Sequence, residues 1–238
     1  MFEATEARME AFEHFGGQRL APEMFSVLSL RAVGLDKLVD DKQMGLSGPY
    51  DSRLGKVLLK AAAYLLREQT EVIYAFVAPP ELNLLLDVDS FRERRDPRAL
   101  VTRFAGLASA KGSLLVGFPI SFDCRLFCFP GEEQATDYFS WRQDARLVGT
   151  LDHYCRWVLV DNGADPAGAE RILDGLGLEE KQEVLANNEV GLDQIPAWQR
   201  GGSGIFWGDD ANGKSQLVID TELPTGDDYR DFVTRFLS

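Results

Sequence analysis

The sequence predicts an α+β protein built on a split βαβ (ferredoxin-like) antiparallel sheet. Over the first 130 residues, apolar runs of strand length and amphipathic helical stretches follow one another in the order β, α, β, β, α, β. A mostly helical second half follows, with two short strands near its end. The chain has 238 residues, 45% of them hydrophobic, which suffices for a substantial buried core.

The first strand and helix have the clearest patterns. Residues 25–30 form an apolar run typical of a strand. Residues 50–68 place apolar side chains at i, i+3, i+4, i+7, i+8 and i+11 counted from Leu54, which is the spacing of one buried helix face. A shorter helix is expected from Glu3 to Phe15, because its apolar residues are near helical spacing, and Gly16 and Gly17 end it.

The remaining elements of the first half complete the pattern. Two apolar runs, 72–77 and 82–88, flank Ala78-Pro79-Pro80-Glu81 and predict a hairpin or bent connection. Residues 98–111 have helical periodicity. Residues 123–129 predict a strand that ends at Pro130-Gly131.

The second half predicts a helical extension. A long helix is expected over 132–160, two short helices over 166–175 and 179–186, and an amphipathic tail helix over 229–237 that docks on its own domain. Two short strands, 204–207 and 216–219, flank an Asn212-Gly213 turn. We therefore expect a palm-like α+β core over 1–130 and, over 131–238, a helical extension with short strands packed on it.

The charge balance limits the partners. The 25 basic and 38 acidic residues give a net charge of −13, which disfavours non-specific binding to nucleic acids or acidic membranes. No uncharged apolar run approaches the roughly 18 residues of a membrane helix. Three scattered cysteines argue against a disulfide framework. We expect a cytoplasmic protein without membrane contact.

Several motifs occur in a fixed order along the chain. They are Pro49-Tyr50-Asp51-x-Arg53, Phe122-Asp123-x-Arg125, Asp137-Tyr138-Phe139-x-Trp141-Arg142-Gln143, Lys181, and Ile195-Pro196-Ala197-Trp198-Gln199-Arg200-Gly201. The series, over roughly residues 7 to 207, resembles the tRNA-histidine guanylyltransferase superfamily, polymerases that add nucleotides in the reverse direction to tRNA 5′ ends. The resemblance implies a polymerase-like palm in which two aspartates hold two magnesium ions that drive nucleotidyl transfer.

The two aspartates are missing from the corresponding positions. Depending on register, the first becomes Arg31, which is preferred, or Ser29, and the second becomes Pro80. Only the adjacent acid, Glu81, is retained. Because an arginine repels a cation and a lone serine lacks charge, we expect no catalytic residue and no metal site in this palm. We further expect the Arg31 guanidinium to pair with Glu81 in place of the metal charge.

Other charged residues are weaker candidates. Asp87, Asp89 and Asp123 are a fallback set of relocated metal ligands, although a charged loop after a strand explains the first two more simply. Residues 91–111 hold six basic and two acidic side chains, a net charge of +4, which indicates either a phosphate contact or a solvated face. The candidates for contact with nucleotide or tRNA phosphate are Arg92, Arg94, Arg95, Arg125, Arg142, Lys181 and Arg200.

These observations favour a catalytically degenerate homologue, a pseudoenzyme without a cofactor of its own. It is expected to be a structural, regulatory or tRNA-positioning subunit in a hetero- or homo-oligomer with a guanylyltransferase-like protein. Nucleoside triphosphate and tRNA are expected to be reached through that partner. One alternative is an active Mg²⁺-dependent tRNA 5′-end nucleotidyltransferase with relocated ligands. Another is a nucleotide-sensing module that binds triphosphate without turnover.

Overall fold

The computed structural model describes residues 5–6, 8–9, 11–14, 17–34, 52–89 and 96–237. Its centre is a six-stranded sheet in the order β4-β1-β3-β2-β5-β6, in which every neighbouring pair is antiparallel. The strands are β1 (Phe25–Val33), β2 (Val72–Ala78), β3 (Glu81–Leu86), β4 (Ser121–Phe129), β5 (Ser203–Asp209) and β6 (Ser215–Asp220). With α3 (Ser52–Glu68) and α4 (Pro97–Val116), the first four strands follow the predicted β-α-β-β-α-β order, so the α+β class is confirmed.

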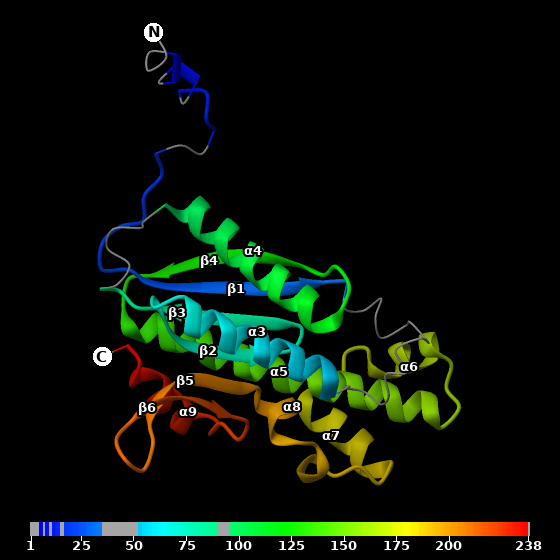
Figure 1. The fold of residues 1–238 in the computed structure, drawn as a ribbon. Helices are drawn as coiled ribbons and strands as arrows, with labels where there is room; N and C mark the ends of the chain where they lie inside the picture. The colour runs from blue at the N-terminus through cyan, green and yellow to red at the C-terminus, as the bar shows by residue number, and fades with distance from the viewer. Residues whose placement is uncertain are drawn as a thin grey trace.

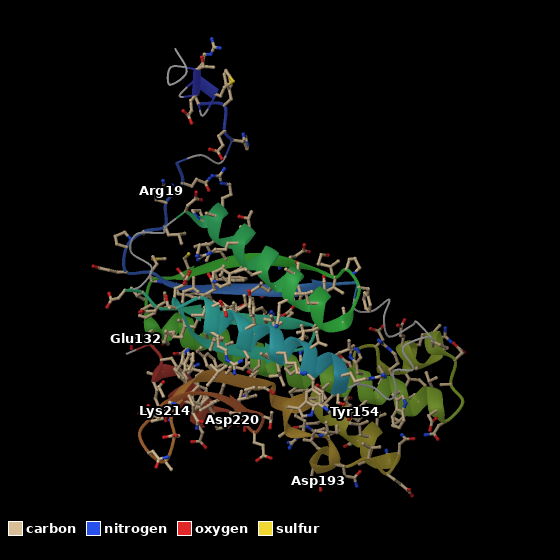
Figure 2. All side chains as sticks on the ribbon, in the orientation of Figure 1. Arg19, Glu132, Tyr154, Asp193, Lys214 and Asp220 are labelled. Carbon is tan, nitrogen blue, oxygen red and sulfur yellow. The ribbon has the colours of Figure 1, made fainter. Side chains whose placement is uncertain are left out.

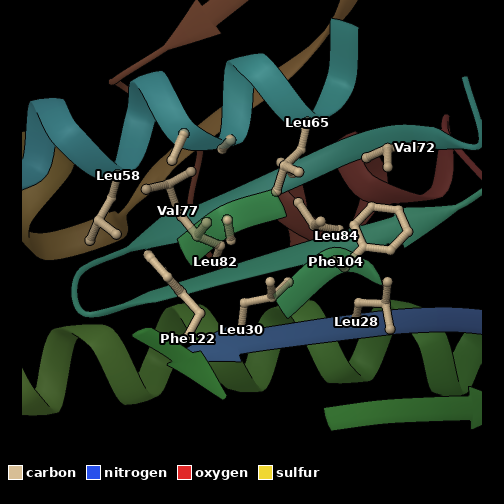
Figure 3. Close-up of a cluster of buried hydrophobic side chains, with 14 of the residues drawn as sticks. Leu28, Leu30, Leu58, Leu65, Val72, Val77, Leu82, Leu84, Phe104 and Phe122 are labelled. Atoms are coloured by element: carbon tan, nitrogen blue, oxygen red, sulfur yellow. The ribbon is translucent and has the colours of Figure 1, made fainter. Parts of the chain in front are cut away.

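Helices α3 and α4 cover one face of the sheet, in front of it in Figure 1. Side chains on alternate positions of β1 and β3, including Leu28, Leu30, Leu82 and Leu84, point to this face and are fully buried (Figure 3). They pack against the predicted apolar stripe of α3. Burial of each such leucine contributes about 2 kcal/mol, so this layer stabilises the palm.

Helix α4 is longer than predicted because both of its ends are capped. The Asp96 side chain accepts hydrogen bonds from the backbone N–H groups of Arg98 and Ala99, and Gly117 ends the helix at φ 84°. Among the described residues, α4 is the helix that could span a membrane by length and composition. One face of it, with Phe104 and Ala108, is fully buried against α3 and the sheet, whereas 22% of its apolar window is buried in all.

The long helix α5 (Glu132–Asp161) lies on the opposite face, behind the sheet in Figure 1, together with the tail helix α9 (Asp227–Thr234). The buried tyrosine hydroxyls of Tyr74 on β2 and Tyr229 on α9 are 3.0 Å apart and hydrogen-bonded. Phe232 and Val233 are also buried there. The prediction that the tail docks on its own domain is therefore confirmed.

A small helical layer surrounds the C-terminal half of α5. It comprises α6 (Pro166–Leu173), α7 (Leu178–Asn187), the short η1 (Leu192–Gln194) and α8 (Ala197–Gly201). Tyr154 of α5, labelled in Figure 2, donates a hydrogen bond to the Gln199 side chain of α8 at 2.6 Å. From α8 the chain enters β5, which pairs with β2. The sheet therefore contains strands from both sides of residue 130, and the division into 1–130 and 131–238 stays a prediction.

Two short helical elements, η1 and α8, were not predicted, and the other differences concern element ends. Strand β3 ends at Leu86 rather than at Val88, and β4 begins two residues early at Ser121. The N-terminal helix predicted over 3–15 lies partly outside the described residues, and the described Met9 and Phe12 in it are exposed.

Candidate functional site

Two rows of polar residues cross the α5-facing side of the sheet at the end that carries the β2–β3 turn. Directly opposed residues of antiparallel strands point to the same face. The register places Asp123, Arg31 and Glu81 in one row across β4, β1 and β3. The next row holds Arg125, Ser29 and Asn83. Both positions predicted for the lost β1 aspartate, Arg31 and Ser29, therefore lie in one polar site with the retained Glu81.

Arg142, from α5, joins the strands of this site. Its guanidinium forms an ion pair with Glu81, and it donates hydrogen bonds to the Ser29 hydroxyl from Nη2 and to Asn83 Oδ1 from Nε, both at 3.2 Å. Its Cζ lies 4.9 Å from the ring centre of Trp141. Burial, with the nearby charge of Arg31, lowers the pKa of Arg142. The planar fork of donors suits a position between two strands, where several acceptors converge.

The counter-charge to Glu81 therefore comes from a different residue than predicted. The expectation that Arg31 pairs with Glu81 is wrong, because among the described residues the ion pair is made by Arg142. Arg31 lies directly opposite Glu81 in the register, but its side chain is exposed. Arg142 reaches the Glu81 carboxylate from α5, which covers this face of the sheet, and its guanidinium is partly desolvated there. Partial desolvation makes this ion pair stronger than one between exposed side chains.

Tyr138 completes the site from α5. Its hydroxyl donates a hydrogen bond to Asn83 Oδ1 at 2.7 Å, and its ring packs against Phe127, Phe129 and Trp141. Burial raises the pKa of Tyr138 to about 12, so the hydroxyl is protonated and donates at neutral pH. Asn83, fully buried in a strand whose other residues after Glu81 are leucines, is the residue that sequence reasoning missed. A polar amide between Leu82 and Leu84 was the available signal.

The side chains at the positions predicted for the metal ligands do not fit a two-magnesium centre. Such ions need paired carboxylate oxygens, and these positions hold Arg31 or Ser29 on β1 and Pro80 at the turn. The two acids of the row, Asp123 and Glu81, lie on strands on either side of β1, roughly 10 Å apart along the hydrogen-bonding direction. No group of three or more His, Cys, Asp or Glu side chains within the described ranges could hold a metal ion.

The fallback acids do not lie together. Asp87 and Asp89 follow β3 at the end opposite to Glu81, and the Asp87 carboxylate accepts the Asp89 backbone N–H at 3.1 Å. Asp123 lies near the Glu81 end of the sheet. The length of β3 therefore separates Asp123 from the other two.

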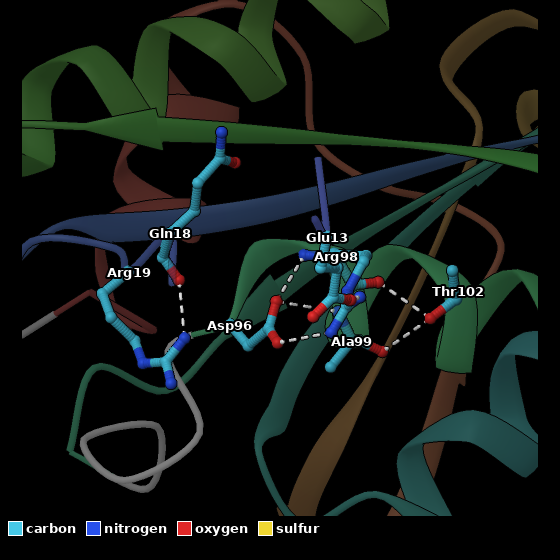
Figure 4. A network of polar contacts seen from close by, with 7 residues as sticks. All are labelled: Glu13, Gln18, Arg19, Asp96, Arg98, Ala99 and Thr102. Atoms are coloured by element: carbon cyan, nitrogen blue, oxygen red, sulfur yellow. Dashed lines mark hydrogen bonds and ion pairs between the residues drawn. The ribbon is translucent and has the colours of Figure 1, made fainter. Parts of the chain in front are cut away.

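Only residues 96–111 of the basic segment 91–111 lie within the described part of the chain. Arg92, Arg94 and Arg95 lie outside the described residues. Arg98 forms ion pairs with Glu13 and Asp96 (Figure 4). Arg103 forms an ion pair with Glu71, whose side chain is buried. These two arginines have acidic partners within the protein, which favours a structural role for them.

The other phosphate candidates are spread over the molecule. Arg125 is exposed beside Ser29 on the palm face. Lys181 on α7 pairs with Asp152 of α5 at 2.7 Å. Arg200 on α8 donates from Nε to the Ile195 carbonyl at 2.9 Å. Of the described candidates, the structure brings Arg125 and Arg142 together at the palm and leaves Lys181 and Arg200 in the helical layer.

The strand order, the two covering helices and the polar row beside the β2–β3 turn define a protein of the polymerase-palm class. The chain shares this fold with tRNA(His) guanylyltransferase from Saccharomyces cerevisiae, at a TM-score of 0.74 and 21% identity over 89% of this chain and 95% of that one. A bacterial tRNA(His) guanylyltransferase (Thg1)-like protein in complex with ATP superposes at a TM-score of 0.79, with 18% identity over 97% of each chain. At these identities, the likeness shows the fold alone.

Sequence comparison supplies the family. The model of the Thg1 C-terminal domain matches residues 133–229. A probable tRNA(His) guanylyltransferase of Dictyostelium discoideum is 29% identical over 169 residues, 66% of each chain. The Arabidopsis thaliana tRNA(His) guanylyltransferase 1 is 25% identical over 168 residues, and the match spans 66% of this chain but 30% of that much longer protein. The chain belongs to the tRNA-histidine guanylyltransferase superfamily, as its motifs predicted, and is a tRNA(His) guanylyltransferase-like protein.

Proposed function

We propose that this chain is a catalytically degenerate member of the superfamily that serves as a non-catalytic subunit. In this role it assembles with an active homologue and helps to position tRNA. The observation that carries the proposal is the guanidinium of Arg142, which is ion-paired with the one retained acid, Glu81, beside the β2–β3 turn.

The chemistry of the palm supports this proposal. Two-metal phosphoryl transfer requires carboxylates that share the ions. Here three arginines, Arg31, Arg125 and Arg142, occupy the two polar rows and the helix above them, against two acids, Asp123 and Glu81. The local charge is therefore positive, in a chain whose net charge is −13. A positively charged palm repels divalent cations and disfavours catalysis by the chain alone.

The need for a partner follows from the charge of the whole molecule. Binding to tRNA depends mainly on neutralisation of phosphates by basic residues. With 38 acidic and 25 basic residues, this chain has little capacity for such binding except at local patches. An active homologue with its own tRNA-binding surface would supply the affinity, and this chain would add contacts through the arginines of its palm.

The first experiment tests catalysis. The purified chain is incubated with Mg²⁺, labelled GTP and a 5′-activated tRNA, and an active superfamily member is the positive control. We expect no incorporation of label. Incorporation that is lost on Asp→Asn substitution of Asp87, Asp89 or Asp123 would favour instead the active transferase with relocated ligands.

The second experiment tests assembly. The tagged chain is co-expressed with an active homologue from the same cell, and the pair is purified and assayed for tRNA affinity and transfer rate. We expect a stable complex that exceeds the homologue alone in at least one of these measurements. A homologue that neither co-purifies nor changes in affinity or rate would contradict the subunit role.

A further inference from the structure

Among the strands that the structure describes, β6 lies at one end of the sheet and has β5 as its one neighbour (Figure 1). Antiparallel strands exchange backbone hydrogen bonds at every second residue pair. In the β5–β6 hairpin the Asp210 N–H donates to the Lys214 carbonyl at 2.9 Å, which fixes this alternation along the register. Leu217 and Ile219 therefore belong to the pairs without hydrogen bonds, so their N–H and C=O groups point away from β5. Within the described part of the chain, nothing else bonds to these outward groups.

The opposite end of the sheet, at β4, is partly closed by α4. The Ser109 hydroxyl of α4 accepts the Phe122 N–H at 2.9 Å, and the Ser113 hydroxyl accepts the Ile120 N–H at 2.9 Å. Proteins commonly protect a strand edge with proline, lysine or a covering side chain, because an unprotected edge pairs readily with another chain. The sequence of β6 contains neither proline nor lysine. Of the two outer strands, β6 is thus the one more open to pairing.

An apolar strip on the α3 side of the sheet reaches this free edge. The register places Trp207 opposite Leu217 and Ile205 opposite Ile219. Directly opposed residues share a face, and Ile205 is buried in the layer beneath α3 and α4. Trp207 and Ile219 are, in contrast, 46% and 48% exposed. Exposed apolar side chains beside an open strand edge indicate a surface that contacts another chain.

The charges at the two ends of β6 are opposite in sign. Lys214 directly precedes the strand, whereas Asp220 ends it and Glu222 follows two residues later; Lys214 and Asp220 are labelled in Figure 2. The ion pairs between described residues include none of these three side chains. Antiparallel pairing of two identical strands brings the beginning of each beside the end of the other. β6 is therefore complementary to itself in charge, as an interface around a two-fold axis requires.

We propose that β6 pairs with β6 of a second copy of this chain around a two-fold axis, so that two six-stranded sheets become one. A register centred on Val218 places Leu217 opposite Ile219 of the second copy. Outward backbone groups then meet outward backbone groups. The apolar strip becomes continuous, because Trp207 and Leu217 of one copy align with Ile219 of the other. The inference goes beyond the proposed function and does not depend on it, since its partner is a second copy and not an active homologue.

The pattern of side chains along β6 selects this register. Centred on Val218, each of the three consecutive apolar residues, Leu217, Val218 and Ile219, faces an apolar residue of the second copy. Centred on Leu217, the pairing would place Ile219 opposite the polar Ser215. Centred on Ile219, it would place Val218 opposite Asp220. Apolar cross-strand pairs stabilise a sheet, whereas these mixed pairs do not.

The first test measures association. Sedimentation velocity of the full chain at increasing concentration should show a dimer. Ile219→Lys leaves the new charge in solvent in a single copy but places it within the apolar strip of the dimer, so dimerisation should weaken by about tenfold or more. Ile172→Lys on α6 is the matched control, because Ile172 is 49% exposed and the change in charge is the same. It should leave the dissociation constant unchanged.

The second test reverses the charges. Lys214→Glu places like charges beside Asp220 and Glu222 of the second copy, and should weaken the dimer severalfold at low salt and less at high salt. Adding Glu222→Lys to Lys214→Glu restores an opposite charge and should recover part of the affinity. A double variant as weak as Lys214→Glu alone would contradict the antiparallel pairing of the two strand ends.

The third test measures the register by cross-linking. Opposed residues of a pair without hydrogen bonds have Cα atoms about 4.5 Å apart, which a disulfide can span. Val218→Cys should therefore form a covalent dimer on mild oxidation. Gln216→Cys should not, because the two copies of residue 216 would lie about 14 Å apart in this register. Both variants keep the three native cysteines, which makes each a control for the other.

The outcomes are distinct from those that test the proposed function. A chain that stays monomeric, a dimer that Ile219→Lys does not weaken, or equal cross-linking of Val218→Cys and Gln216→Cys would overturn the β6 pairing. A monomer whose co-purification with an active homologue is lost in Ile219→Lys would assign this edge to the homologue and also overturn it. The non-catalytic role would stand in each case, since it is tested by nucleotidyl transfer.

Discussion

At the residue scale, the palm is organised around Arg142. One guanidinium bonds to a hydroxyl on β1 and to an amide and a carboxylate on β3. The side chains of Arg142 and Glu81 are 14% and 24% exposed, so the pair is well shielded from solvent. A pair in such a position costs little while it is intact but leaves an uncompensated charge when one partner is removed.

The first prediction concerns this pair. Arg142→Met removes the cation, keeps much of the side-chain volume, and leaves the Glu81 carboxylate and Asn83 Oδ1 with fewer donors. We expect a loss of about 2 kcal/mol in the free energy of unfolding, measured by urea denaturation at pH 7.

The matched control is the double variant Arg142→Met with Glu81→Gln, in which no charge is stranded. It should recover part of the lost stability. A single variant as stable as the unsubstituted chain would show that the ion pair does not hold the strands.

The sequence predicted that Glu81 would need a counter-charge but assigned the wrong arginine. Arg31 and Glu81 lie on neighbouring strands, so an ion pair between them could be proposed from the predicted strand order alone. The approach of Arg142 depends on how α5 crosses the sheet, and no local pattern in residues 132–160 encodes that crossing. Asn83 was missed for the same reason, since its partners lie on α5.

At the scale of elements, the tail helix α9 is held by two buried tyrosine hydroxyls. Burial raises the pKa of Tyr229 and that of Tyr74 above the ordinary value of 10.0. A tyrosine whose pKa is raised in the folded state contributes stability that is fully present below pH 10 and is lost as pH rises toward the folded pKa. Stability should therefore fall above pH 10.

The second prediction uses Tyr229→Phe. At pH 7 the variant loses the hydrogen bond to Tyr74, at a cost of about 1 kcal/mol. Above pH 10 the unfolding free energy of the variant should fall less steeply with pH than that of the unsubstituted chain. The two slopes should differ by up to about 1.4 kcal/mol per pH unit, because one buried titrating group is gone. Urea unfolding at pH 7, 10 and 11 measures both effects. Tyr64→Phe on α3 is the control, and an identical slope in all three proteins would refute the explanation.

The third prediction concerns the junction of α8 and β5. Gly202 has φ 75°, and a Cβ at this position would lie 2.5 Å from the Phe76 ring. Gly202→Ala combines an unfavourable backbone conformation with steric overlap, so we expect a loss of about 3 kcal/mol in unfolding free energy. Gly213 has nearly the same φ, 73°, with open space around it. Gly213→Ala should therefore cost only about 1 kcal/mol, and equal losses would exclude the contact with Phe76.

Most of the fold could be predicted at this scale. The hairpin around Pro79-Pro80, the stripe of α3 and the order of the first six elements follow from local periodicity. The pairing of β5 with β2 did not follow, because residues 203 and 77 are far apart in the sequence and short strands carry no signal of their neighbour. The C-terminal end of α4 was missed, because the helix continues beyond the predicted residue 111 to Val116, where Gly117 caps it.

At the scale of the whole molecule, the charge distribution separates the palm from the rest of the chain. A palm with three arginines and two acids is part of a protein of net charge −13. The fourth prediction follows: the chain alone should bind tRNA weakly at physiological salt, and its affinity should depend only shallowly on salt because few phosphates are neutralised. Filter binding between 50 and 200 mM KCl measures this dependence. A steep decline would reveal a large basic surface and contradict the need for a partner.

The central claim is that the acidic side chains of this palm do not hold divalent cations. Crystals grown with Mn²⁺ and GTP test it most directly, because manganese replaces magnesium and is located by anomalous scattering. We expect the Arg142 guanidinium to lie against Glu81, with no anomalous peak at coordinating distance, about 2.2 Å, from the carboxylate of Glu81 or Asp123. A peak bonded to either carboxylate beside an ordered triphosphate would contradict the claim.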